Sequence, residues 1–228
     1  GPNQDLWEYP VPQVDFAGIS ADFGTLKTLA QTNGIYYARY STGTATTSAS
    51  YWNGYRLTFN SNDTVTVRRV SATTQLQVVP VNSAEWNTDR ALIATDDAYE
   101  TSTLPATCGL IFVEDNVWVE GTIPRKITLI AANVVNANIA PNAYLRGNLQ
   151  YAASDGTDGL TLVAENNVLV APNAPTNTTL NGIFIAQTGA FGRNLYLSSS
   201  RSDCNSTYGP KGTLTILGTT VSNKRPGT

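Results

Sequence analysis

The stretch Val117-Trp118-Val119-Glu120-Gly121 carries the pattern that decides the fold of this chain. Apolar residues alternate with others in it and lead to a small residue, and the same pattern recurs along the second half of the sequence. The small residues are Gly121, Ala131, Gly147, Ala164 and Gly218. When a sixth copy that ends at Gln187 is included, the copies end about 19 residues apart on average, which is typical of one coil of an irregular β-solenoid. We therefore predict an irregular parallel β-helix over residues 105–228.

One copy of the pattern departs from the rule, and an alternative fold stays open. Ile183 and Ile185 alternate in the same way, but the copy ends on Gln187. An antiparallel β-sandwich also has alternating strands and turns rich in Gly and Asn. The recurring small residue favours the solenoid, because a sandwich does not require it. Asparagines that tolerate turn conformations are expected at the corners between coils. These are Asn133, Asn148, Asn166, Asn167 and Asn223.

The sequence pattern of residues 1–104 predicts one helix followed by short antiparallel strands. The helix is predicted over residues 21–32, because Ser20 can cap its start and Gly34 stands where a C-terminal glycine is common. Phe23, Leu26 and Ala30 would then share one face. Alternation predicts strands after it. They cover residues 35–40, 55–59, 65–68 and 76–78. The Ser, Thr, Gly and Ala stretch 41–50 predicts a mobile loop.

Composition excludes several classes of function. The 228 residues carry 14% charged side chains and a net charge of −3, so no global positive field draws the chain onto nucleic acid or anionic lipid. Histidine is absent, which removes Ser-His-Asp triads, His-liganded zinc and histidine general bases. No apolar run is long enough to span a bilayer. The start, Gly1-Pro2, looks like the remnant of a protease site, and we expect the natural start to be missing.

Three stretches give the chain a resemblance to a known family. They are residues 109–121 (GLIFVEDNVWVEG), 163–170 (VAENNVLV) and 183–194 (IFIAQTGAFGRN). Together they resemble the surface-exposed part of large, minor pilin-like proteins of bacterial type IV pili. The resemblance covers about residues 105–225 and implies a small pilin-like region, residues 1–104, joined to a β-solenoid. It also implies an N-terminal apolar helix, absent here, as the only link to the membrane.

Cys108 and Cys204 are the only cysteines. In an exported protein, which the resemblance implies, two cysteines predict one structural disulfide. Two unpaired thiols are the alternative. No CxxC spacing or basic neighbour indicates a reactive thiol.

Other candidate sites are weaker. Asp155 and Asp158 flank a Gly-Thr pair that either binds Ca²⁺ or forms a plain turn, and the turn is favoured because an EF-hand needs further acidic ligands. The acids considered for glycoside hydrolysis are Asp96, Asp97, Glu114, Asp115 and Glu165. Adjacent acids on a strand point to opposite faces, which argues against catalysis.

Basic and aromatic side chains are the candidates for binding surfaces. The basic residues near or in the second half are Arg125, Lys126, Arg146, Arg193, Lys211, Lys224 and Arg225. They could bind phosphates or acidic sugars only if the coils place several of them on one face. Because there are so few, we expect separate, solvated charges instead. The tryptophans and the eleven tyrosines are either a stacking platform for glycans or core. For Trp118 alone the strand pattern predicts an outward direction.

These observations lead to one functional hypothesis with two alternatives. The resemblance implies a non-enzymatic, extracellular component of a type IV pilus, a minor pilin or tip adhesin, that contributes to adhesion or pilus initiation. Its partners would be other pilin subunits and a host surface, glycan or DNA. No catalytic residue, metal or cofactor is expected, and no ligand-binding residue is assigned. The alternatives are a polysaccharide-active β-helix enzyme and a DNA- or glycan-binding surface module.

Overall fold

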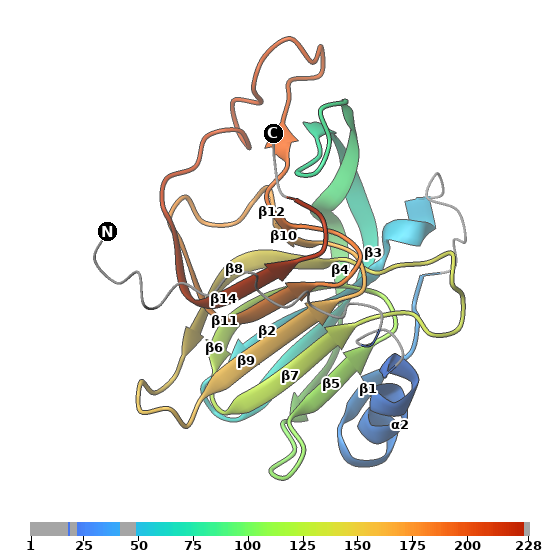
Figure 1. The fold of residues 1–228 in the computed structure, drawn as a ribbon, viewed down its shortest axis with the longest axis vertical. Helices are drawn as coiled ribbons and strands as arrows, with labels where there is room; N and C mark the ends of the chain where they lie inside the picture. The colour runs from blue at the N-terminus through green and yellow to red at the C-terminus, as the bar shows by residue number, and fades with distance from the viewer. Residues whose placement is uncertain (1–17, 19–21, 42–48, 226–228) are drawn as a thin grey trace, which may run out of the picture.

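The computed structural model describes residue 18, residues 22–41 and residues 49–225. Within them the protein is mainly β, with one helix near the N-terminus and one large sheet that curls into a half-barrel (Figure 1). The helical elements are α2 (Phe23–Asn33) and the short 3₁₀ helix η2 (Ala49–Trp52). The strands of the first half are β1 (Ile35–Tyr37), β2 (Gly54–Asn60), β3 (Thr64–Val79) and β4 (Asn87–Thr103). The strands of the second half are β5 (Leu110–Val113), β6 (Asn116–Ile123), β7 (Lys126–Ala131), β8 (Ala143–Tyr151), β9 (Gly159–Ala164), β10 (Val168–Val170), β11 (Thr178–Ala186), β12 (Phe191–Gly192), β13 (Leu195–Tyr196) and β14 (Leu214–Ser222).

Helix α2 confirms the predicted helix and its buried face. Phe23 and Ala30 are buried and Leu26 is half-buried, and together they pack on the outer side of β5. Gly34 is the C-cap of the helix, and only a glycine fits there because a Cβ would lie 2.4 Å from the carbonyl oxygen of Leu110. Asp22 occupies the N-cap position without a side-chain hydrogen bond. The predicted cap, Ser20, and most of the predicted loop 41–50 lie outside the described residues.

The first half contains four strands, as many as the sequence predicts, but the chain divides into them differently. The two predicted strands at 65–68 and 76–78 are parts of one strand, β3, which pairs antiparallel with β2 and with β4. Strand β4 was not predicted, because most of its side chains are polar and half-buried or exposed. Irregularities in the β3–β4 register bend this long hairpin without interrupting it.

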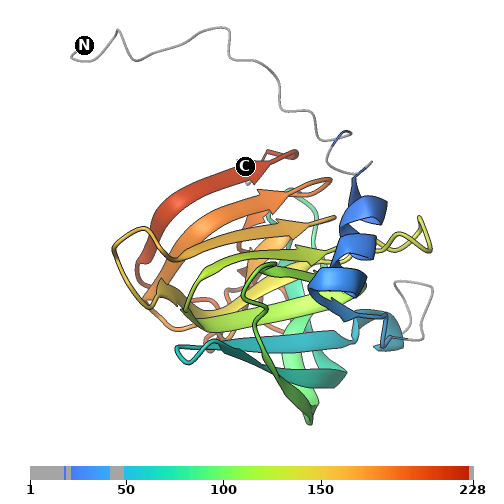
Figure 2. The same cartoon turned by 90° about the horizontal axis from the view of Figure 1, so that it is seen from below.

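Strands of the second half pair in parallel. One series of neighbours runs β1, β5, β7, β9, β11 and β14. A second series runs β2, β6, β8, β10 and β12. Figure 2 shows the strands side by side, with α2 along one side of the stack. The sheet crosses the predicted boundary at residues 104 and 105, since β1 pairs with β5 and β2 with β6.

The small residues that define the sequence pattern do not form one row, because the strands of the second half belong to two series. Ala131 and Ala164 lie opposite each other and continue to Ala186 on β11. Gly218 lies opposite Gly182 instead. Gly147 lies on the other series, over the side chain of Glu120. Gly121 packs on β2, where a Cβ would lie 2.2 Å from the carbonyl oxygen of Phe59. The small residues are therefore needed at four different contacts.

Trp118 faces away from the main core, as predicted, but it is not exposed. It is fully buried in a second apolar cluster, where it stacks on Tyr144 with ring centroids 4.9 Å apart. Its indole Nε1 donates a hydrogen bond to the carbonyl of Ala91 on β4. The β3–β4 hairpin thus covers the outer side of β6 and β8, so Trp118 offers no stacking platform.

The predicted disulfide is not formed in the structure. Cys108 precedes β5 and packs near α2. Cys204 is exposed, and its backbone pairs with that of Leu197 in an isolated antiparallel β-bridge. These two segments lie at opposite ends of the molecule (Figure 1). The large separation is the physical reason that the thiols remain unbonded.

The helices of the described residues include none that is long and apolar enough to cross a membrane.

Candidate ligand-binding site

A cavity of about 350 Å³ opens between the end of β1 and the β2–β3–β4 strands. Five tyrosines and two arginines dominate its lining, and we call it the Tyr–Arg pocket. Its side chains are Tyr36, Tyr37, Arg39, Tyr40, Tyr55, Arg69 and Tyr99. This chemistry, aromatic rings around cationic side chains, is that of a ligand-binding site.

Strand register brings three of these residues together. Tyr55 on β2 and Arg69 on β3 lie directly opposite each other in the antiparallel pair. Tyr99 is on β4, where the register shifts so that Arg68 faces Ala98 and Val67 faces Glu100. The shift leaves Tyr99 as an extra residue in the ladder. A β-bulge re-aims a side chain in this way, and here it brings the Tyr99 ring to Arg69.

The guanidinium of Arg69 lies between two aromatic rings. Its central carbon is 3.8 Å from the ring centroid of Tyr99 and 5.3 Å from that of Tyr40. Arg69 forms no ion pair with any carboxylate of the described residues, and its Nε is buried without a hydrogen-bond partner among them. The pocket therefore holds a cation that is stacked but not neutralised by a carboxylate.

The remaining rings form a rigid wall. The centroids of Tyr37 and Tyr55 are 5.2 Å apart, and Tyr99 is 6.2 Å from each. The Tyr37 hydroxyl donates to Glu100 at 2.8 Å, and the Tyr55 hydroxyl donates to the carbonyl of Ala38 at 2.8 Å. Burial raises the pKa of both phenols, so they act as neutral hydrogen-bond donors at physiological pH.

The Glu114-Asp115 turn, part of the motif that carries the family resemblance, fixes the other side of the pocket. Glu114 accepts hydrogen bonds from the Tyr36 hydroxyl at 2.5 Å and from Lys27 Nζ at 2.7 Å. Asp115 is 1% exposed and accepts from the backbone N–H groups of Tyr40 and Ser41, at 3.0 and 2.8 Å. Burial raises the pKa of Asp115 to about 6. These two acids position the pocket's tyrosines.

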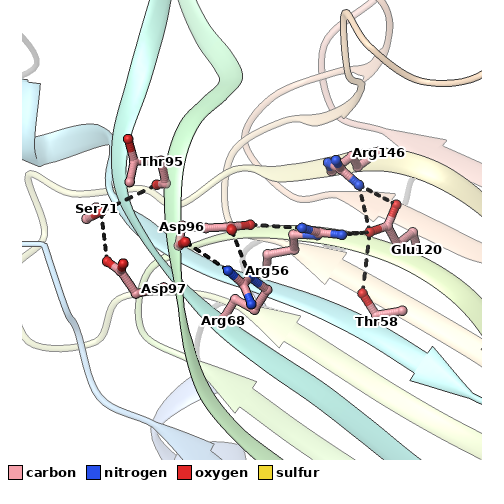
Figure 3. Close-up of polar contacts among 9 residues, drawn as sticks. All are labelled: Arg56, Thr58, Arg68, Ser71, Thr95, Asp96, Asp97, Glu120 and Arg146. Atoms are coloured by element: carbon pink, nitrogen blue, oxygen red, sulfur yellow. Dashed lines mark hydrogen bonds and ion pairs between the residues drawn. The ribbon is translucent and has the colours of Figure 1, made fainter.

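The other paired acids, Asp96 and Asp97, point apart. Asp96 lies in a network of ion pairs on the outer face of the sheet, with Arg56 at 2.9 Å and Arg68 at 2.7 Å (Figure 3). Arg56 also contacts Glu120, which pairs in turn with Arg146 at 2.7 Å. Figure 3 shows Asp97 on the far side of β4, where it accepts from Ser71. The network crosslinks strands β2, β3, β4, β6 and β8.

The remaining predicted acidic site residues make separate hydrogen bonds. Glu165 accepts from the backbone N–H of Asn133. Asp155 accepts from Thr157, and Asp158 accepts from the N–H of Ala153, so each closes a local turn. No group of three or more possible metal ligands occurs among the described residues. The favoured prediction, a plain turn, agrees with these bonds.

Four of the basic residues considered in the sequence contact groups within the protein. Arg125 pairs with Asp63 and Arg146 with Glu120. Arg193 donates to the carbonyls of Tyr208 and Gly209, and Lys211 donates to that of Ala174. Lys126 is exposed.

Sequence reasoning did not single out Arg69 or Tyr99. The run from Ile35 to Tyr40, with three tyrosines and an arginine in six residues, was the available signal for an aromatic site. The contribution of β4 depends on the bulge at Tyr99, which alternation does not reveal.

Comparison with known proteins adds no relative: no protein-family model, curated sequence or solved structure matches the chain.

Proposed function

We propose that this chain is a non-enzymatic, cell-surface component of a type IV pilus system that contributes to adhesion. The three stretches that resemble minor pilin-like proteins motivate the filament assignment. In this proposal residues 105–228 wind as a β-solenoid on a smaller pilin-like region. The parallel register of two strand series, β5–β7–β9–β11 and β6–β8–β10–β12, supports the winding.

One observation carries the adhesive role: Arg69 stands between two tyrosine rings in an open pocket without a carboxylate partner. A sugar ring packs well on exposed aromatic faces, and a guanidinium binds a carboxylate or sulfate with strong, charge-assisted hydrogen bonds. The pocket is thus suited to an acidic glycan.

Paired-acid hydrolysis is less well supported than binding. Glu114 and Asp115 are committed to neighbouring tyrosines and backbone N–H groups, and Asp96 is committed to two arginines. A glycosidase needs two carboxyl groups facing one another across a substrate.

The proposal that the Tyr–Arg pocket binds an acidic glycan is tested by measuring the binding of alginate oligosaccharides and sialyllactose to the protein. Arg69→Ala and Tyr99→Ala are each expected to weaken binding at least about tenfold, because each removes a principal contact. Arg90→Ala is the matched control, since Arg90 lies on the same hairpin and contacts Thr73 and Gln75 instead. Equal binding by all four proteins, or binding of neither probe by the parent, would refute the acidic-glycan assignment.

The filament role is tested in the source cell. Deletion of the gene is expected to reduce attachment, and the tagged protein is expected to co-purify with pilin subunits. Unchanged piliation and attachment, with no pilin captured, would exclude it.

A further inference from the structure

A second cavity, of about 280 Å³, lies beside η2, between the β3–β4 turn and two corners of the second half. Amide side chains line it together with one buried carboxylate and one indole, and we call it the asparagine pocket. The residues used below are Trp52, Asn82, Asp89, Asn142, Asn166 and Asn194. None of them belongs to the Tyr–Arg pocket.

The floor of the asparagine pocket is a closed set of hydrogen bonds. Asp89 is 5% exposed and accepts from the Tyr196 hydroxyl at 2.9 Å and from Asn194 Nδ2 at 3.2 Å. The Asn194 Oδ1 accepts from the backbone N–H of Val81 at 2.9 Å, which ties the β3–β4 turn to the floor. These bonds fix the floor before any ligand arrives, which lowers the entropic cost of binding.

The wall is fixed in the same manner, but two of its amides are uncommitted. Asn142 and Asn167 are held by hydrogen bonds between successive corners, with Asn167 Nδ2 donating to Asn142 Oδ1 at 3.0 Å. The side chains of Asn82 and Asn166 form no hydrogen bond with the described residues, so they offer donors and acceptors to a ligand. The indole of Trp52 adds an aromatic surface beside them.

Charge decides the class of ligand. No lysine or arginine lines the asparagine pocket, so nothing there compensates an anion. The buried carboxylate of Asp89 already accepts several hydrogen bonds from the protein, so it does not require a cationic ligand. Amides around an aromatic ring match a neutral molecule with many hydroxyl groups. The cavity lies slightly below the roughly 300–1,000 Å³ of sites for drug-sized ligands, which suits a single ring.

We propose that the asparagine pocket binds one neutral sugar ring, with its apolar face on Trp52 and its hydroxyl groups on Asn82 and Asn166. This site is separate from the acidic-glycan site and does not depend on a filament role. It would allow the protein to hold two chemically different residues of a surface polysaccharide.

The test uses the methyl glycosides of glucose, galactose, mannose and N-acetylglucosamine as probes, measured by saturation-transfer NMR and by calorimetry. At least one is expected to bind in the millimolar range or tighter, with little dependence on salt. Trp52→Ala and Asn166→Ala are each expected to weaken that binding at least about fivefold. Trp86→Ala is the matched control, because Trp86 is 55% exposed and stacks on Arg201 outside both pockets.

Thermal unfolding of each variant shows whether it is folded, and Asn166→Ala keeps the test valid if Trp52→Ala does not fold. Failure of all four glycosides to bind would overturn the proposal, as would unchanged affinity in Asn166→Ala. Arg69→Ala is expected to leave glycoside binding unchanged, so this result is independent of the proposed acidic-glycan site. A loss in Arg69→Ala equal to that in Asn166→Ala would place the glycoside in the Tyr–Arg pocket and overturn the proposal.

Discussion

The Oδ1 atom of Asn116 accepts a hydrogen bond from the backbone N–H of Asn142, at 3.0 Å, across two neighbouring corners of the sheet. Asn142 repeats this contact one corner further on, where its Oδ1 accepts from the backbone N–H and from Nδ2 of Asn167 at 3.2 and 3.0 Å. Asn167 in turn accepts from the N–H of Ala190 at 2.9 Å. The three asparagines form a ladder that satisfies backbone N–H groups just before strands β8, β10 and β12 begin.

Asn142→Ala is expected to destabilise the protein by about 2–3 kcal/mol. The substitution leaves two donors of Asn167 without their acceptor in a part-buried place, and such unmade bonds carry the desolvation cost of each group. Denaturant unfolding measures the change. Asn138→Ala is the control, because Asn138 is exposed and its side chain makes no hydrogen bond with the described residues; its effect is expected to stay within about 0.5 kcal/mol. Equal effects of the two variants would contradict a structural role for the ladder.

Gly218→Ala is expected to cost more than about 2 kcal/mol. A Cβ at this position would lie 1.9 Å from the carbonyl oxygen of Gly182 on the neighbouring strand, and the residue has φ of +145°. Gly24→Ala provides the contrast, since a Cβ there meets nothing within 4 Å and the site is an exposed helix. It is expected to raise stability by about 0.5–1 kcal/mol. If the melting temperature moved in the same direction for both variants, the close contact between Gly218 and Gly182 would not explain the change in stability.

The sequence pattern predicted the apolar strands of the second half well, but not what joins them. Val117 and Val119 lie opposite Ala143 and Leu145 because the same alternation recurs on β6 and β8. Of the ladder, only Asn167 was among the asparagines expected at corners, since Asn116 and Asn142 precede strands instead of following a small residue. The local signal for αL turns therefore says little about hydrogen bonds between neighbouring strand ends.

The candidate site was less predictable than the fold, because it depends on a hairpin that crosses the sheet. Arg69 and Tyr99 are 30 positions apart and meet only through the bulge in β4. For Trp118, alternation correctly predicts that the side chain faces away from the main core, but it does not predict that the β3–β4 hairpin covers that face. A period of two residues identifies faces, whereas the packing of a distant hairpin decides which face is open.

Glu120→Gln is expected to destabilise the protein by about 1–2 kcal/mol, because Arg146 loses its charged partner and Arg56 loses one of two, at a side chain that is 17% exposed. The loss is expected to shrink as salt increases, since the arginines remain partly accessible to counter-ions. Urea unfolding at low and high sodium chloride measures both effects. Glu85→Gln, at an exposed acid without an ion pair in the described residues, controls for the change in net charge. A loss that is independent of salt would argue that Glu120 acts through packing alone.

Asp115 makes stability depend on pH in a predictable direction. Its pKa is about 6 in the folded protein and about 3.8 in the unfolded chain, so between these values the folded protein holds a proton that the unfolded chain has released. The free energy of unfolding is therefore expected to fall as pH rises from about 4 to about 6, by about 3 kcal/mol from this group, and to change little with it outside that window. Asp115→Asn cannot titrate, so the stability difference between parent and variant isolates this contribution from all other carboxyl groups. Ser41→Ala removes the hydroxyl that donates to Asp115 Oδ1 at 2.9 Å, which is expected to raise the pKa further and extend the fall to higher pH. A parent-minus-variant difference that is flat from pH 4 to pH 7 would contradict the assignment, and the pocket wall at Tyr40 would then be held by an acid that is ionised throughout.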